Sequence, residues 1–151
     1  MASYCEPRLS LAPGSIEDSI RVLVVEDDAD SAELVRLNLT GFGESNFIVE
    51  RCQNLVDAMA RLRQPGIDVV LLDLGLPELS GFKSHRAIDY AAGREVPVVI
   101  YTADETAASR KLTLGAGAAS YLIKDHCSPA RLKEALRQAV LHVRTGRAMV
   151  D

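Results

Sequence analysis

Polar side chains follow the apolar runs of this sequence at the points where those runs end. Glu26 and Asp27 follow the first run, Asp73 the third, Thr102 the fourth and Lys124 the fifth. Any one of them could be a helix cap, a β-forming residue or a solvated side chain. Together they put three acids, a hydroxyl and an ammonium at equivalent points of the chain, which predicts one shared site.

The charges of these residues indicate the chemistry. Three crowded carboxylates raise one another's pKa unless a cation intervenes. Oxygen ligands suit Mg²⁺, which keeps several waters. A metal bound by Glu26, Asp27 and Asp73 would also neutralise an incoming phosphoryl group and leave Asp73 ionised as a nucleophile. With Lys124 and Thr102 holding the phosphoryl oxygens, the set predicts a site that forms an aspartyl phosphate.

The elements that must position these side chains alternate along the chain. Five segments with helical signals separate five strand candidates, which are IRVLVV, FIVERC, DVVLLD, PVVIYT and SYLIK. This alternation predicts an α/β fold of (βα)5 type, flavodoxin-like, with a doubly wound five-stranded parallel sheet. Such sheets bind ligands beyond the carboxyl ends of their strands, where the winding reverses. With strand order 2-1-3-4-5, that point lies between strands one and three and puts Glu26 and Asp27 beside Asp73.

The helical segments differ in clarity. The last is the clearest, because its apolar residues recur at helical spacing and Ser128 and Pro129 supply its cap and first turn. Asn54 is the expected cap of the second helix. Segment 104–114 predicts a weaker helix without a firm apolar stripe, and we expect this element to move. Two further helices are expected over about 29–39 and 81–92.

Length and charge limit the class of protein. The 151 residues, 48% of them hydrophobic, suffice for one ordinary domain. We expect a flexible arm over residues 1–19, a domain over 20–146 and a tail over 147–151. The net charge of −4 and the absence of a basic cluster argue against direct nucleic-acid binding. Residues 1–19 contain no apolar stretch long enough for a signal peptide or a membrane span.

The cysteines and histidines predict no site of their own. The three cysteines, Cys5, Cys52 and Cys127, are odd in number and form no CxxC, which fits a reducing cytoplasm better than a disulfide framework or a zinc site. The three histidines show no ligand spacing and are expected in solvent or on helix surfaces; they are His85, His126 and His142.

The motifs VLVVEDD, VVLLDLGLPELSG, VVIYTA and GAGAASYLIKD resemble the receiver domain of two-component response regulators, over about residues 20–146. The resemblance implies that Asp73 is the phosphoacceptor. It also implies that Asp27, Asp73 and the backbone carbonyl of Gly75 bind Mg²⁺, with Glu26 acting through a coordinated water. Asp28 matches a position that is often acidic, but a role as a simple helix cap is at least as well supported.

The resemblance further implies a switch rather than an enzyme, with at most self-catalysed phosphotransfer and dephosphorylation. A phosphoryl group would draw Thr102 and Lys124 inward, and the weak helix would reposition with Tyr121, which swings between exposed and buried rotamers. The implied donor is a sensor histidine kinase or a histidine phosphotransfer protein. A downstream effector and a homodimer through the fourth-helix to fifth-helix face are further implied partners. The expected contacts with the kinase are Ser31, Leu34, Val35 and Ser128.

Two features depart from the pattern of this family. Asp125 follows Lys124, whereas many relatives have proline at this position and a cis peptide bond between the lysine and the proline. A cis bond without proline costs about 3 kcal/mol, so we predict a trans bond here. In addition, no output domain follows the last helix, so the chain is either a single-domain regulator or a receiver cut from a larger hybrid kinase or regulator.

Other classes fit less well. Phosphatases of the haloacid dehalogenase type also form an aspartyl phosphate, but their general acid stands two residues after the nucleophile, where this chain has Gly75. A flavodoxin-like nucleotide or flavin module needs a glycine-rich first loop, and the loop here is EDDADS. A degenerate receiver that only binds proteins would not need the full set of acids, threonine and lysine.

Overall fold

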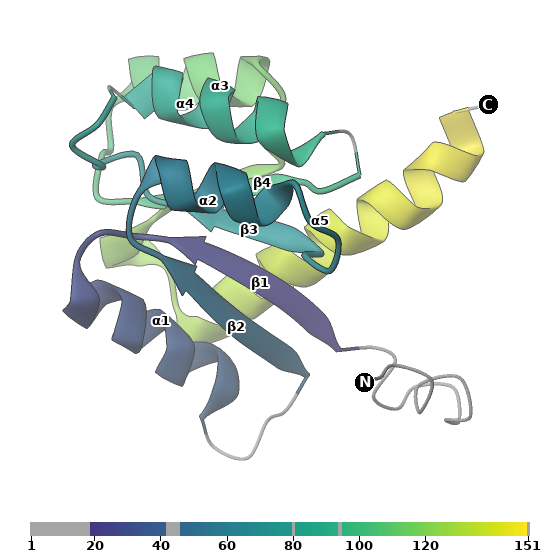
Figure 1. Ribbon diagram of the computed structural model, residues 1–151, viewed down its shortest axis with the longest axis horizontal. Helices are drawn as coiled ribbons and strands as arrows, with labels where there is room; N and C mark the ends of the chain where they lie inside the picture. The colour runs from purple at the N-terminus through teal and green to yellow at the C-terminus, as the bar shows by residue number, and fades with distance from the viewer. Residues whose placement is uncertain (1–18, 42–45, 80, 94, 151) are drawn as a thin grey trace.

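A computed structural model describes residues 19–41, 46–79, 81–93 and 95–150. Nearly all of the expected N-terminal arm lies outside these residues. The described chain forms a five-stranded parallel sheet in the order β2-β1-β3-β4-β5, with helices on both faces (Figure 1). The predicted α/β class and strand order are therefore confirmed. The strands are β1 (Ile20–Val25), β2 (Phe47–Cys52), β3 (Val69–Leu72), β4 (Val98–Thr102) and β5 (Ser120–Ile123).

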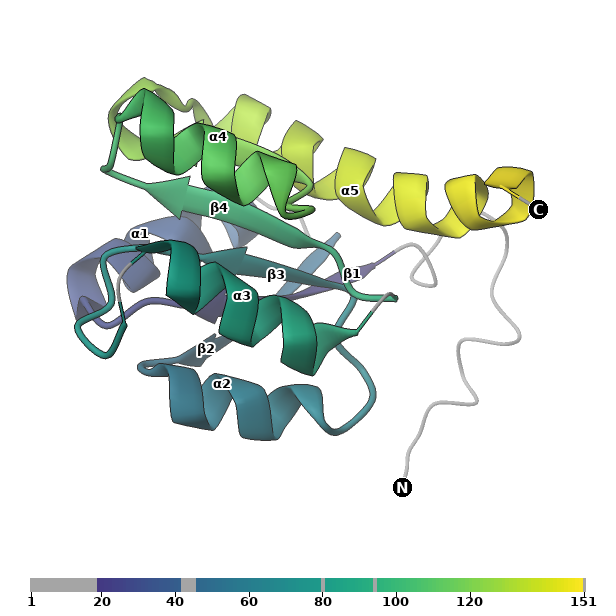
Figure 2. The same cartoon turned by 90° about the horizontal axis from the view of Figure 1, so that it is seen from above.

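The five helices divide between the two faces of the sheet. Helices α1 and α5 share one buried cluster with the sheet, and residues of α2 and α3 lie in the other. Figure 2 shows α5 running past the ends of the strands. This helix continues to Val150, four residues beyond the expected domain end at Gly146. The bounds are α1 (Ala29–Thr40), α2 (Leu55–Leu62), α3 (Gly81–Ala92), α4 (Ala107–Gly115) and α5 (Pro129–Val150).

Side-chain caps define where the helices begin. Asp28 accepts a hydrogen bond from the Ser31 N–H at 2.8 Å, and Asn54 accepts one from Asp57 at the same distance. Ser128 Oγ accepts from the backbone N–H of residue 131, as predicted for the last helix. Helix α4 starts later than expected, because Thr106 provides its cap and keeps residues 104–106 out of the helix.

The continuous apolar runs of the sequence correspond to strands buried on both sides. Every residue of β3 and β4 is buried, and so is all of β1 except one residue. The edge strand β2 is only half covered. The peptide bond between Lys124 and Asp125 is trans, as predicted, since the described residues contain no cis bond. Every described helix is too short or too polar to span a membrane.

The expectation that His85 is solvated is wrong. Helix α3 turns Ser84, His85 and Ile88 toward the core, and both His85 and Ser84 are completely buried. Neither ring nitrogen of His85 has a hydrogen-bond partner among the described residues. Helix α3 packs against α2 and α4, and no pattern of the sequence marks His85 as a buried residue. His126 and His142 are exposed, as expected.

Replacing His85 by leucine should stabilise the fold. The buried, unpartnered imidazole costs about 1–3 kcal/mol, which the variant recovers. Burial lowers the pKa of His85. The charge of Asp89 raises this pKa and the charge of Arg86 lowers it further. The unfolded chain therefore takes up the proton first as the pH falls below about 6.5, and the folded state loses stability there. Urea unfolding between pH 7 and pH 5 should show a higher free energy of unfolding and a weaker pH dependence for His85→Leu.

The control is His142→Leu, at an exposed position. It should leave both the free energy of unfolding and its pH dependence close to those of the wild type. A destabilised His85→Leu variant with an unchanged pH slope would contradict the account of His85.

Candidate functional site

Three carboxylates meet at the carboxyl edge of the sheet. Strands β1 and β3 are neighbours and pair as far as Val25 and Leu72, so the residues that follow them emerge side by side. One carboxylate oxygen from each of Glu26, Asp27 and Asp73 lies within 4.8 Å of the other two. The sheet thus assembles the acidic set that the sequence predicts.

Lys124 joins this cluster from β5, at the far end of the sheet. Its Nζ lies 2.7 Å from Glu26 Oε1 and 3.2 Å from Asp73 Oδ2. The Glu26 and Asp73 side chains are only 4% and 12% exposed, and that of Lys124 is 19% exposed. A single ammonium therefore bridges two largely buried carboxylates.

Burial and charge act on these groups in opposite directions. Burial raises the pKa of Glu26, and the adjacent Asp73 adds to this effect while Lys124 opposes it. Burial also works against ionisation of Asp73, but the hydrogen bond from the Gly75 N–H, a side-chain hydrogen bond with Glu26 and the hydrogen bond and positive charge of Lys124 outweigh it and lower the pKa of Asp73. Burial disfavours the Lys124 ammonium, yet the two carboxylates raise its pKa. Asp73 is therefore the acid that this environment keeps ionised.

Backbone groups orient the acids. The Gly75 N–H donates to Asp73 Oδ1 at 3.0 Å, and the Asp28 N–H donates to Glu26 Oε2 at 3.3 Å. Asp28 itself caps α1, so its carboxylate is engaged there, as one of the two interpretations predicts.

The acidic set fits Mg²⁺. Mg²⁺ takes oxygen ligands, often one or two carboxylates together with waters, and Glu26, Asp27 and Asp73 offer three converging oxygens. Burial is the main cause that raises the pKa of Glu26 and Asp73 adds to it, and a divalent cation would relieve this added repulsion. Such an ion would supply positive charge to an anionic group entering at Asp73.

Thr102 and Tyr121 lie beside the loop between β4 and α4. Thr102 Oγ1 accepts a hydrogen bond from the Asp104 N–H at 3.3 Å. Tyr121 is buried, and its hydroxyl donates to the Asp104 carbonyl at 2.9 Å and hydrogen-bonds Ser109 Oγ at 3.1 Å. Both side chains contact the same loop residue, so a movement of this loop would affect both.

Arg51 and Ser109 contact this region without having been anticipated from the sequence. Arg51 donates to the backbone carbonyls of Glu26 and Asp27, each at 3.1 Å. Residues at the carboxyl ends of parallel strands lie at the same edge of the sheet. This argument could have identified Arg51, which lies near the end of β2. Ser109 carries no such signal, because its contact with Tyr121 depends on how α4 packs.

One of the expected kinase contacts is wrong. Val35 is only 2% exposed and packs in the core against the sheet, because it lies on the inner face of α1. Leu34, on the outer face, is 57% exposed, and Ser128 is also exposed. Ser31 is partly exposed. Three of the four expected residues therefore remain available at the surface.

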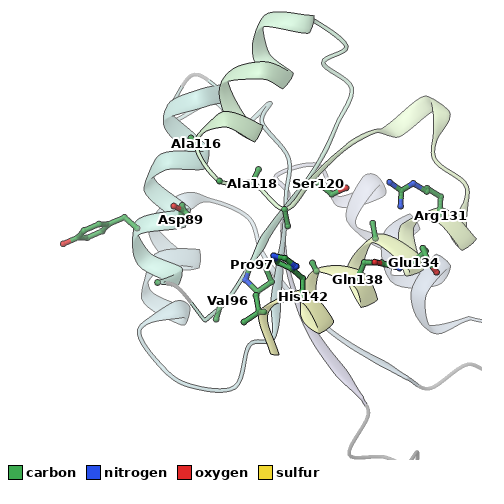
Figure 3. Close-up of a pocket in the computed structure, with 17 residues that line it drawn as sticks. Asp89, Val96, Pro97, Ala116, Ala118, Ser120, Arg131, Glu134, Gln138 and His142 are labelled. Atoms are coloured by element: carbon green, nitrogen blue, oxygen red, sulfur yellow. Dashed lines mark hydrogen bonds between the residues drawn. The ribbon is translucent and has the colours of Figure 1, made fainter. Parts of the chain in front are cut away.

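A groove lies at the opposite edge of the sheet. It has a volume of about 1220 Å³ and includes Pro97 and Ser120, at the amino ends of β4 and β5. Figure 3 shows Arg131 and Glu134 of α5 on one side of it and Asp89 of α3 on the other. None of the expected site residues lines this groove, so the acidic edge and the groove are separate features.

Comparisons with known proteins identify a family and several relatives of this chain. The family model described as "Response regulator receiver domain" matches residues 22–137. The chain is 33% identical over 129 residues to the transcriptional regulatory protein ZraR of Salmonella typhimurium, covering 85% of this chain and 28% of ZraR. It is 31% identical over 126 residues to the response regulator MprA of Mycobacterium ulcerans, covering 82% of this chain and 53% of MprA. The chain thus spans only part of these relatives.

Solved structures share the fold. The receiver domain of the sensor histidine kinase PA1611 from Pseudomonas aeruginosa, which has a magnesium ion coordinated in its active-site cleft, is 27% identical with a TM-score of 0.67, covering 81% of this chain and 98% of that one. The signal receiver domain of a LuxO-type repressor from Vibrio parahaemolyticus has a TM-score of 0.74 at 22% identity, covering 87% of this chain and 97% of that one. The chain belongs to the response regulator receiver domain family.

Proposed function

We propose that Asp73 is the phosphoacceptor of this receiver domain, and that it takes a phosphoryl group from the phosphohistidine of a sensor kinase or a phosphotransfer protein. The observation that carries this proposal is the bridge from Lys124 Nζ to both Glu26 and Asp73 beside three converging acids. In the reaction an Asp73 oxygen bonds to phosphorus while the phosphorus–nitrogen bond to the donor imidazole breaks and the imidazole keeps the electron pair.

The other residues would prepare Asp73 and hold the group that it receives. Glu26, Asp27 and Asp73 would hold Mg²⁺ with the Gly75 carbonyl, and the ion would supply positive charge for the phosphoryl oxygens. The magnesium in the PA1611 receiver supports this assignment. Lys124 would pair with one phosphoryl oxygen and Thr102 with another.

The same event would bias the loop between β4 and α4. Thr102 and Tyr121 both bond Asp104, so a movement of Thr102 toward the phosphoryl group would alter the contacts that hold Tyr121 and α4. Thr113 is the buried residue of helix α4, so little apolar burial holds this helix in place, and it would be displaced at little cost.

This role is compatible with a domain over residues 20–146 in the cytoplasm, acting alone or as the receiver module of a longer regulator. The net charge of −4 supports a protein partner rather than direct nucleic-acid contact by this domain. Leu34 and Ser128 would contribute to the kinase-facing surface because both are exposed.

Incubation with acetyl phosphate and MgCl₂ should add one phosphoryl group to the wild-type chain, measured by intact mass spectrometry. Hydroxylamine should remove it, because an acyl phosphate is cleaved by this nucleophile. Asp73→Asn should abolish the gain, and Asp89→Asn, on α3, should retain it. Phosphorylation of Asp73→Asn at the wild-type level would disprove the assignment.

Lys124→Met should slow phosphorylation by about 100-fold, because one preorganised donor to the phosphoryl oxygens is lost. The initial rate of phosphoryl incorporation, measured by quenched mass spectrometry, checks this. Lys83→Met removes an exposed lysine of α3 and should keep the wild-type rate. Equal rates in the two variants would refute the role of Lys124.

Tyr121→Phe should loosen α4 without changing the rate of phosphorylation. The variant loses the hydroxyl bonded to Asp104 and Ser109, about 1 kcal/mol, and amide hydrogen exchange over residues 104–115 should quicken by about fivefold. Ser109→Ala should give a smaller increase in the same amides, because Tyr121 keeps its bond to the Asp104 carbonyl. Unchanged exchange in both variants would count against this contact as the anchor of α4.

A further inference from the structure

Arg51 reaches from the edge strand β2 to the loop that carries two of the three acids. Its Nε donates to the Glu26 carbonyl at 3.1 Å, and its Nη2 donates to the Asp27 carbonyl at the same distance. The two bonds come from one planar guanidinium and end on successive peptide groups. They join β2 to the loop at the point where Glu26 and Asp27 leave β1.

The guanidinium makes these contacts with carbonyls, although carboxylates lie close by. Among the described residues Arg51 forms no ion pair, whereas Glu26 pairs with Lys124. The Glu26 N–H is also tied to β2, because it donates to the Cys52 carbonyl at 3.0 Å. The loop is therefore held from β2 on both sides of the Glu26 residue, and its carboxylates are left to converge on Asp73.

We propose that Arg51 is a positioning residue for the metal site: it fixes the backbone of Glu26 and Asp27 so that their carboxylates converge before a cation binds. This inference rests on the proposed function, in which these acids hold Mg²⁺. Holding like charges together is unfavourable, and a loop fixed in advance reduces the part of that cost which the metal must offset. The planar fork of arginine suits this task, because its donors keep a fixed spacing.

The positive charge of Arg51 by itself would weaken Mg²⁺ binding, whereas the positioning role strengthens it. A positive side chain near the site repels a divalent cation, so a purely electrostatic role predicts tighter Mg²⁺ binding once the charge is removed. Positioning predicts weaker binding. The sign of the change therefore separates the two roles.

Isothermal titration calorimetry of MgCl₂ into the metal-free protein measures this sign. Arg51→Ala should weaken Mg²⁺ binding by about tenfold, as is typical when a side chain that orients metal ligands is lost. Arg51→Lys keeps the charge but loses the planar pair of donors, so it should bind Mg²⁺ no more tightly than Arg51→Ala. The control Arg63→Ala removes the same charge from the C-cap of α2 and should keep the wild-type affinity.

A second measurement needs no metal. Amide hydrogen exchange at residues 27 and 28 in the metal-free protein should be faster in both Arg51 variants than in the wild type and in Arg63→Ala. Tighter Mg²⁺ binding by Arg51→Ala, or wild-type affinity in Arg51→Lys, would overturn the positioning role, as would unchanged exchange in both variants.

The failure of the proposed function would look different. If the wild type bound no Mg²⁺ and acquired no phosphoryl group, both the metal site and the role of Arg51 would fall. If the wild type bound Mg²⁺ and was phosphorylated while the Arg51 variants matched it, the inference about Arg51 alone would fail.

Discussion

Two largely buried carboxylates, held beside each other by one ammonium, are the constraint on which this domain depends. Glu26 and Asp73 would repel each other at the edge of the sheet without Lys124, whose Nζ lies within 3.2 Å of both. The two pKa shifts reflect this balance. The pKa of Glu26 is raised, so Glu26 is harder to ionise, while the pKa of Asp73 is lowered, so Asp73 stays ionised. Asp73 is thus kept in its carboxylate form in surroundings that would otherwise neutralise it.

The rest of the fold supplies the rigidity that this balance requires. The central strands are covered on both faces by two separate apolar clusters, so the carboxyl ends of β1 and β3 have little freedom to separate. Lys124 must reach the acids from β5, which lies at the other end of the sheet order from β2. From the β2 side, Arg51 holds the loop of Glu26 and Asp27 through their carbonyls. The site is therefore supported from both edges of the sheet.

Polar contacts hold α4 and the loop before it, the part of the structure that we expect to move. Helix α4 depends on a threonine cap and on the hydroxyl of Tyr121, with little apolar burial of its own. The burial of His85 in α3, by contrast, has no evident part in the site, and its unpartnered nitrogens reduce the stability of the core. Apolar packing thus covers the strands from which the acids project, whereas polar contacts hold the loop between β4 and α4.

The sequence by itself determined the five strands of the sheet, most helix caps and the acids with their lysine, because hydrophobic periodicity and strand-end position are local properties of the chain. The expected strand order 2-1-3-4-5 is confirmed by the pairing of the strands, which is a property of the tertiary structure. Only the tertiary structure decided that Val35 and His85 are buried, because helix rotation depends on packing against distant elements. It also revealed that Arg51 bonds backbone carbonyls and that Tyr121 points inward to Ser109. Such contacts join residues far apart in the chain, and their geometry follows from packing that no local pattern encodes.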